Sequence, residues 1–178
     1  MSEFLVPTLV TARLRLRGFH PADLTALAAI YADPAVMRYI RDGARTTAQV
    51  AANIDAYDAE WALHRYGVWA IVGPGSDALL GMCGFVERAE IGYIFGRASW
   101  GRGIATEAAD ACLWYGFTQL GLDEIGAGAL QDNAGSRRVL EKLGMRPQAN
   151  EYFDSQGGVY YHLLRADYRP RGPAPTLA

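Results

Sequence analysis

The chain has 178 residues, of which 51% are hydrophobic and 20% are charged. This composition is typical of one globular domain with a full hydrophobic core, and we expect that domain to span residues 1–168. The formal net charge of −2 argues against a nucleic-acid-binding protein, which would normally carry a strongly basic face.

Cysteines and histidines give no sign of a metal site. Cys83 and Cys112 stand in apolar segments and form no C-x-x-C pair, and the three histidines are far apart in the sequence. We therefore expect two buried thiols and no bound metal. We recognise no signal peptide and no apolar run of membrane length, and we expect a cytoplasmic protein that does not associate with membranes.

The first third of the chain predicts one strand followed by helices. After a lead-in over residues 1–12, Arg13–Arg17 alternates charged and apolar residues, as expected of an edge strand with one solvated face. A proline near a helix start, apolar stripes and threonine caps then predict helical segments. These segments are a helix over 21–31, a short helical turn or loop over 36–40, and a helix over 46–65.

The rest of the chain predicts strands around two further helices. Strands are expected over 68–72, 79–87, 90–97 and 124–130, helices from 101 onward and over 133–143, and a final hairpin of 145–153 with 159–165. The tail over 169–178, with three prolines, is expected to be disordered. The order β-α-α-β-β-β-α-β-α-β-β predicts an α+β fold with a mixed sheet and not a doubly wound parallel one.

The stretch from Glu90 to Leu120 contains the most informative pattern. A buried strand passes into a helix through Gly101-Arg-Gly103. Glycines at such a turn let an anion approach, and the first helical turn offers unpaired N–H groups and the positive end of the helix dipole. The sequence therefore predicts a phosphate-binding turn.

Three phosphate ligands compete for this turn. A P-loop would need a lysine followed by serine or threonine after the second glycine, where this chain has Ile104 and Ala105. A dinucleotide fold would need a third glycine where Thr106 stands, in the first strand–helix unit of the chain. The remaining candidate is the pyrophosphate of coenzyme A.

Three motifs in this order resemble the GCN5-related N-acetyltransferase (GNAT) superfamily, and more narrowly the branch of ribosomal-protein N-terminal (alanine) acetyltransferases. They are Glu90-Ile-Gly-Tyr93, Trp100-Gly-Arg-Gly-Ile-Ala-Thr-Glu-Ala108 and Asn133-Ala-Gly-Ser-Arg-Arg-Val-Leu-Glu-Lys-Leu-Gly-Met145. The segments Arg13–Arg17 and Asp33-Pro-Ala-Val-Met37 also match this branch. Trp100 departs from the superfamily's Gln/Arg-x-x-Gly-x-Gly/Ala pattern at its first position. The resemblance implies a GNAT-type fold, with a twisted, mostly antiparallel sheet flanked by helices.

The resemblance also implies acetyl-CoA as co-substrate and no metal. The strands that begin at Glu90 and Glu124 would separate, and the pantetheine arm would lie between them. The implied cofactor contacts are the backbone at Ile94 and Phe95, the turn residues Gly101, Arg102, Gly103, Ile104, Ala105 and Thr106, and the next helix's Asn133 and Ser136.

Ser136 and Glu90 are the candidate catalytic residues. By resemblance, Ser136 is a candidate proton donor to the leaving thiolate, although a serine at a helix start can equally bond the backbone. A thiol pKa of about 8.5 makes that demand modest. Glu90 is the candidate base for the amine, unless placing the amine beside the thioester suffices. Glu107, in the first helical turn, is expected to be structural.

The amine acceptor is the open part of the prediction. Tyr39, Trp69 and Tyr152 are aromatic candidates for its pocket. The sequence predicts an N-acetyltransferase, monomeric or homodimeric, that transfers acetyl directly to a primary amine such as a protein N-terminal α-amine. Two alternatives stay open. One is an acetyltransferase for a small-molecule amine, such as an antibiotic, polyamine or amino acid. The other is an acyl-CoA-binding module without turnover.

Overall fold

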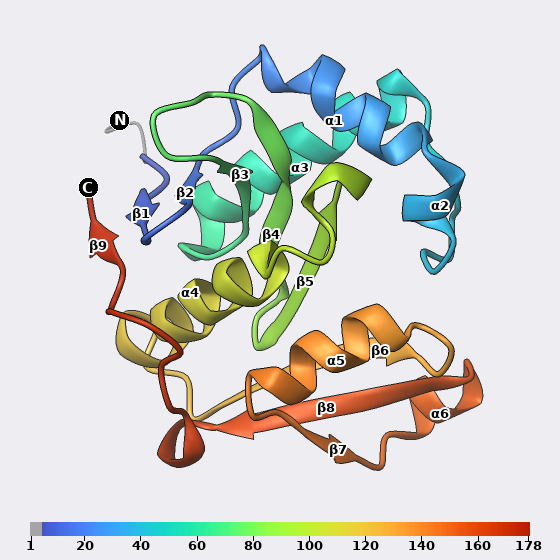
Figure 1. Cartoon of the computed structure of the whole chain (residues 1–178), viewed down its shortest axis with the longest axis vertical. Helices are drawn as coiled ribbons and strands as arrows, with labels where there is room; N and C mark the ends of the chain where they lie inside the picture. The colour runs from blue at the N-terminus through green and yellow to red at the C-terminus, as the bar shows by residue number, and fades with distance from the viewer. Residues whose placement is uncertain (1–4) are drawn as a thin grey trace.

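The computed structural model describes residues 5–178 of the chain. They form a nine-stranded sheet in the order β7-β8-β6-β5-β4-β3-β2-β1-β9, flanked by helices (Figure 1). The neighbours in this sheet pair antiparallel except β5 and β6, which pair parallel. This mixed sheet with flanking helices confirms the predicted fold class.

The elements have the following bounds. The strands are β1 (Leu9–Val10), β2 (Arg15–Arg17), β3 (Val68–Val72), β4 (Leu79–Glu87), β5 (Glu90–Phe95), β6 (Glu124–Leu130), β7 (Arg146–Gln148), β8 (Gly158–Leu164) and β9 (Thr176–Leu177). The helices are α1 (Asp23–Ala32), α2 (Pro34–Met37), α3 (Thr47–His64), α4 (Ile104–Thr118), α5 (Ala134–Lys142) and α6 (Glu151–Ser155). None of the helices within 5–178 combines the length and apolarity needed to cross a membrane.

The two faces of the sheet are covered by different helices. Side chains on one face, including Cys83, Ile91 and Tyr161, belong to the main core, which α4 completes. Ile94 points to the opposite face, because successive side chains of a strand alternate. There it packs against a second cluster, which Leu27 and other residues of α1, α2 and α3 form.

The pairing between β5 and β6 is confined to one end. Glu90 and Gly126 form the register pair that joins these strands, and the Gly126 N–H donates to the Ala89 carbonyl at 2.7 Å. Beyond this point the two strands separate, and Figure 1 shows β6 leading away from β5. The end of β5 is therefore left without a neighbouring strand on one side, as the resemblance implied.

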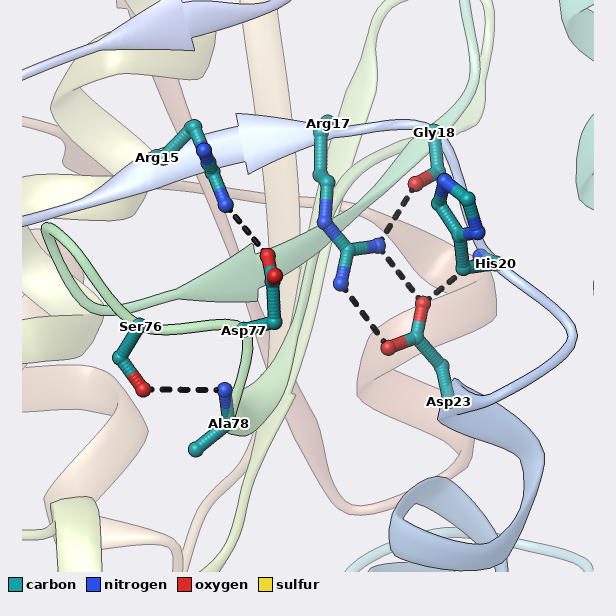
Figure 2. Close-up of polar contacts among 8 residues, drawn as sticks. All are labelled: Arg15, Arg17, Gly18, His20, Asp23, Ser76, Asp77 and Ala78. Carbon is teal, nitrogen blue, oxygen red and sulfur yellow. Dashed lines mark hydrogen bonds and ion pairs between the residues drawn. The ribbon is translucent and has the colours of Figure 1, made fainter.

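A buried ion pair attaches β2 to the start of α1, as Figure 2 shows. The Arg17 guanidinium donates to both carboxylate oxygens of Asp23, at 2.7 and 3.0 Å, and the His20 N–H donates to the same carboxylate at 2.7 Å. Burial alone would raise the pKa of Asp23, but the hydrogen bonds from Arg17 and from the His20 backbone hold it below its ordinary value. These contacts fix α1, and α2 behind it, beside the sheet.

Two expectations about the ends of the chain are wrong. The segment Arg13–Arg17 does not form an edge strand, because β2 lies between β1 and β3. The tail over 169–178 is not disordered throughout, because Thr176–Leu177 forms β9 and pairs with β1. The Arg171 N–H also donates to Asp110 on α4 at 2.8 Å. Prolines keep this tail from regular structure over most of its length, but they leave its last residues free to pair.

The expected final hairpin is also only partly correct. Its second strand is β8, but the first strand, expected over 145–153, ends at Gln148 and is followed by the short helix α6. The Asn150 side chain accepts the Phe153 N–H at 3.2 Å and so caps this helix. An asparagine cap followed by Glu151 is a helix-start signal that outweighed the aromatic residues favouring a strand.

Candidate cofactor site and acceptor face

A cavity of about 560 Å³ lies where β5 ends, between the starts of α4 and α5. Its volume is in the range of small-molecule sites. Of the candidate site residues, those that line it are Tyr39, Ile94, Phe95, Gly101, Gly103, Ile104, Ala105, Thr106, Asn133 and Ser136. The structure therefore brings together most residues that the resemblance assigned to the cofactor.

The glycine turn shapes one wall of this cavity. Gly101 and Gly103 have φ angles of 70° and 77°, in the left-handed region that residues with a Cβ rarely adopt. The first helical bond of α4 runs from the Glu107 N–H to the Gly103 carbonyl. The N–H groups of Ile104, Ala105 and Thr106 thus have no partner within the helix. They offer an anion the hydrogen bonds and the dipole end that the sequence predicted.

Glu107 fixes the start of α4, as expected. Its carboxylate accepts the Thr11 hydroxyl at 2.7 Å, the Arg13 N–H at 2.9 Å and the Arg13 Nε at 2.6 Å. Arg13 also donates to the carbonyl of Arg102 at 2.9 Å. The Arg102 side chain itself is exposed and is not part of the cavity lining. The structure therefore does not place this predicted cofactor-binding side chain at the cavity.

Asn133, Ser136 and Tyr93 form the opposite wall. The Asn133 side chain accepts the Ser136 N–H at 3.0 Å and caps α5. The Ser136 hydroxyl lies 2.9 Å from the Tyr93 hydroxyl, and Tyr93 also donates to the Ser136 carbonyl at 3.2 Å. Burial raises the pKa of Tyr93, so its hydroxyl stays protonated and can orient Ser136.

Several lining residues were not predicted from the sequence. Tyr93 lies within the Glu90-Ile-Gly-Tyr93 motif, but nothing local shows that it reaches Ser136. Arg138 and Lys142 also line the cavity. Their spacing of four residues on α5 places both on one helix face, which is the signal that could have found them. Trp100 lines the cavity and donates its indole N–H to the Phe95 carbonyl at 2.9 Å.

Comparisons with known proteins agree with this geometry. A family model described as an acetyltransferase (GNAT) domain matches residues 13–146. The chain belongs to the GNAT family. A curated relative, the uncharacterized N-acetyltransferase p20 of Bacillus licheniformis, is 32% identical over 177 residues, covering 90% of this chain and 98% of the relative. The predicted acetyltransferase activity is thereby supported at the level of the family.

Solved structures share this GNAT fold. A GNAT-family acetyltransferase from Bacillus anthracis is 27% identical and superposes with a TM-score of 0.79, covering 89% of this chain and 99% of the other. RimL, a ribosomal L7/L12 α-N-protein acetyltransferase in complex with coenzyme A, has a TM-score of 0.75 at 15% identity, covering 87% and 96%. At that identity the second likeness concerns the fold alone.

The predicted acceptor residues of this GNAT protein do not lie together. Tyr39 lines the cavity. Tyr152, on α6, is 58% exposed and lies outside the lining. Its hydroxyl accepts from Arg41 Nη2 at 3.0 Å, and the same nitrogen donates to Gln156 at 2.9 Å. Arg41 therefore links the segment after α2 to α6.

Trp69 does not belong to the acceptor region. All five residues of β3 are buried, and Trp69 itself has no exposed surface. Its indole N–H donates to the Pro7 carbonyl at 2.8 Å, and its ring packs edge-on against Trp61 and Tyr115. Trp61 of α3 and Tyr115 of α4 thus cover the Trp69 ring, which makes it part of the core.

Glu90 lies at the closed end of the β5–β6 pair and is not part of the cavity lining. Burial raises the pKa of its carboxyl above the ordinary value, a hydrogen bond from Tyr160 lowers it, and Glu87 raises it. The net shift is upward. Glu90 and Ile94 share the sheet face opposite α4, since they are four residues apart on one strand.

The thiols agree with the expectation that both are buried. Cys83 and Cys112 are free and have no exposed surface. Their sulfur atoms lie 3.5 Å apart in the core between β4 and α4, and burial raises the pKa of Cys112. Neither thiol reaches the cavity. Within residues 5–178 no three His, Cys, Asp or Glu side chains are grouped to hold a metal ion, and metal-free activity stays a prediction.

Proposed function

We propose that this GNAT protein transfers the acetyl group of acetyl-CoA directly to a primary amine. The observation that carries the proposal is one cavity that joins the glycine turn of α4, the capped start of α5 and the unpaired end of β5. Family membership supports acetyl transfer. The proposal adds that the acceptor of the acetyl group is a primary amine.

The donor would be held mainly by the backbone. The N–H groups of Ile104, Ala105 and Thr106 suit a pyrophosphate, and Arg138 and Lys142 add positive charge at the same cavity. On β5, Gly96 bonds toward β4. Because backbone groups of successive residues alternate in direction, Tyr93 and Phe95 turn theirs toward the gap, where the Phe95 carbonyl already accepts the Trp100 indole N–H and the Phe95 N–H is left for a ligand. These two positions, more than Ile94, suit a pantetheine arm.

When bound, acetyl-CoA supplies a thioester whose carbonyl carbon the amine attacks. Ser136, held by Tyr93, would donate a proton to the departing sulfur. Glu90 would accept the proton of the amine, directly or through water, because burial raises the pKa of its carboxyl and so makes the carboxylate a stronger base. Direct transfer is favoured over an acyl-cysteine intermediate because Cys83 and Cys112 are fully buried.

Calorimetry with acetyl-CoA, followed by a panel of amines with detection of released thiol, tests this proposal. The panel should contain peptides with free N-termini, polyamines, amino acids and amino sugars. We expect micromolar binding and thiol release with at least one class. Protein N-terminal acetylation is our first candidate because the three sequence motifs resemble the branch of ribosomal-protein N-terminal acetyltransferases; release only with small amines would overturn that choice.

Two results would overturn the proposal as a whole. One is the absence of binding at high micromolar acetyl-CoA, which would exclude the donor site. The other is tight binding without thiol release for any amine, which would favour an acyl-CoA-binding module. Neither result includes thiol release, but only the second includes acetyl-CoA binding. Calorimetry on one preparation therefore tells them apart.

A further inference from the structure

The sheet face opposite α4 carries a group of side chains around Gly126. Glu90 pairs with Gly126 across β5 and β6, and Gly126 pairs with His162 across β6 and β8. Residues paired in this way direct their side chains to the same face of the sheet. Tyr160, two residues before His162, shares that face.

Tyr160 reaches Glu90 by lying over Gly126. Although Tyr160 pairs with Gly128, a Cβ built on Gly126 would lie only 1.9 Å from the Tyr160 hydroxyl oxygen and 2.4 Å from its Cζ. The Tyr160 side chain thus extends along the sheet from Gly128, its paired residue, to Gly126. Any side chain at position 126 would collide with the hydroxyl, so the glycine is needed for this placement.

Phe153 supports Tyr160 from the other side. A Cβ on Gly128 would lie 1.8 Å from the Phe153 ring, so this ring occupies the space directly above Gly128. The rings of Phe153 and Tyr160 are 5.2 Å apart and tilted by 33°. Phe153 comes from α6, the helix that the sequence did not predict, and it keeps Tyr160 turned toward Gly126.

Contact with Glu90 is the result of this arrangement. The Tyr160 hydroxyl lies over Gly126, the cross-strand partner of Glu90, and hydrogen bonding from Tyr160 lowers the pKa of the Glu90 carboxyl. Burial, then the charge of Glu90, raises the pKa of Tyr160 to about 12, so the hydroxyl remains a donor at neutral pH.

On this face of the sheet, the charged and titratable groups of the strands around Glu90 are Glu87 on β4, Glu124 on β6, Tyr160 and His162 on β8, and Arg146 on β7. Of the two that act on the pKa of Glu90, Glu87 raises it and Tyr160 lowers it. Tyr160 thus works against burial and against the nearest acid to keep Glu90 in its charged form.

We propose that Tyr160 is a positioning residue for Glu90: its hydroxyl, in the space that Gly126 leaves open, orients the Glu90 carboxylate. The inference rests on the proposed amine acetylation, with Glu90 as the base. A base must be unprotonated to accept the amine's proton, so Tyr160 sets the pH range in which Glu90 can act.

The variant Tyr160→Phe removes the hydroxyl and keeps the ring. With the best amine of the panel, we expect kcat/KM at the acid end of the profile to fall about tenfold, because one hydrogen bond to a charged group is lost. The rising limb moves to higher pH, while the KM for acetyl-CoA stays unchanged. A uniform loss at every pH, without a moved limb, would overturn the proposal.

Tyr168→Phe is the matched control. Its hydroxyl also donates to a carboxylate, that of Asp110 at 3.1 Å, but Asp110 belongs to α4, which lies on the sheet face opposite Glu90. We expect it to leave the pH profile unchanged. A limb that moves equally in both variants would contradict a role specific to Tyr160.

A second measurement does not depend on turnover. In protein labelled with carboxyl-¹³C glutamate, the Glu90 signal, assigned with Glu90→Gln, is titrated by NMR. We expect it to titrate at higher pH in Tyr160→Phe and in Gly126→Ala, whose methyl group displaces the hydroxyl. An unchanged titration in Tyr160→Phe overturns the proposal. If no amine is acetylated, the proposed function fails, and this titration still decides the link between Tyr160 and Glu90.

Discussion

The proposed donor side and the proposed acceptor side of this protein are built from different chemical groups. Around the cavity, two glycines, a short helix start and an asparagine cap present backbone N–H groups to a ligand. On the acceptor side, long side chains from separate segments meet: Arg41 with Tyr152, and Phe153 with Tyr160. Backbone geometry tolerates few substitutions, whereas side-chain contacts can be exchanged one at a time.

This difference suggests a division of labour. A site made of backbone groups suits one constant ligand, since its hydrogen bonds do not depend on which side chains are present. A site made of side chains from a loop, a helix and a strand can be adapted to different acceptors without disturbing the donor. The predictions below test whether the two sides respond separately to substitution.

The largest expected effect comes from a contact that belongs to neither side. Arg17→Met leaves Asp23, which is only 4% exposed, without its partner. We expect the free energy of unfolding in urea to fall by about 3–5 kcal/mol. Arg15→Met is the control on the same strand, because its partner Asp77 is exposed, and it should cost below about 1 kcal/mol.

This effect should depend on pH. Because the folded-state pKa of Asp23 lies below its ordinary value of 3.8, the carboxylate stabilises the fold fully above that value. The contribution is lost as the pH falls through the lower, folded pKa. The difference between wild type and Arg17→Met should therefore shrink in acid. A difference that stays constant from pH 7 to acid would contradict the ion pair as its source.

The next effect tests the donor side alone. Thr106→Asp places a carboxylate among the N–H groups of the first turn of α4, which line the cavity. Repulsion from a pyrophosphate should weaken acetyl-CoA binding about a hundredfold in calorimetry. The helix itself should gain slightly, because an acid in its first turn favours the dipole. The isosteric Thr106→Asn should bind nearly as well as wild type; equal loss in both variants would exclude the electrostatic explanation.

Most of the predicted donor residues line one cavity, because the sequence signals that point to them are local. The glycine turn of α4 (Gly101 and Gly103) and the cap of α5 (Asn133) each depend on a few consecutive residues. A short sequence motif therefore contains all that each of them needs. The contact between Tyr93 and Ser136 joins residues 43 positions apart, and only the fold brings them together. Even here, Arg102 was assigned by its place in the motif, whereas its side chain is exposed and is not part of the cavity lining.

The acceptor side could not be predicted in the same way. Trp69 resembles a pocket residue in sequence, but it is completely buried, with Trp61 of α3 and Tyr115 of α4 against its ring. The placement of Tyr160 depends on missing side chains at Gly126 and Gly128 and on a helix, α6, that a cap of one residue initiates. Such long-range complementarity leaves no periodic signal in the sequence.

A smaller effect is expected at the proposed proton donor. Ser136→Ala should lower kcat about tenfold with little change in the KM for acetyl-CoA. The loss is modest because a thiol has a pKa of about 8.5, so its thiolate is already a fair leaving group. Tyr93→Phe should lower kcat as well, since it releases the Ser136 hydroxyl 2.9 Å away. The double variant should be no slower than the slower single variant. Full additivity of the two losses would show that the residues act independently.

The smallest effects compare the two sides directly through two asparagine caps. Asn133→Ala at α5 and Asn150→Ala at α6 each remove one accepted N–H bond, and each should reduce the free energy of unfolding by about 1 kcal/mol. Their kinetic effects should differ. Loosening α5 should raise the KM for acetyl-CoA, whereas loosening α6 releases Phe153 and should raise the KM for the amine. If both variants change the same KM, the donor and acceptor sides are not separable units, because a disturbance at either cap would then reach the same ligand.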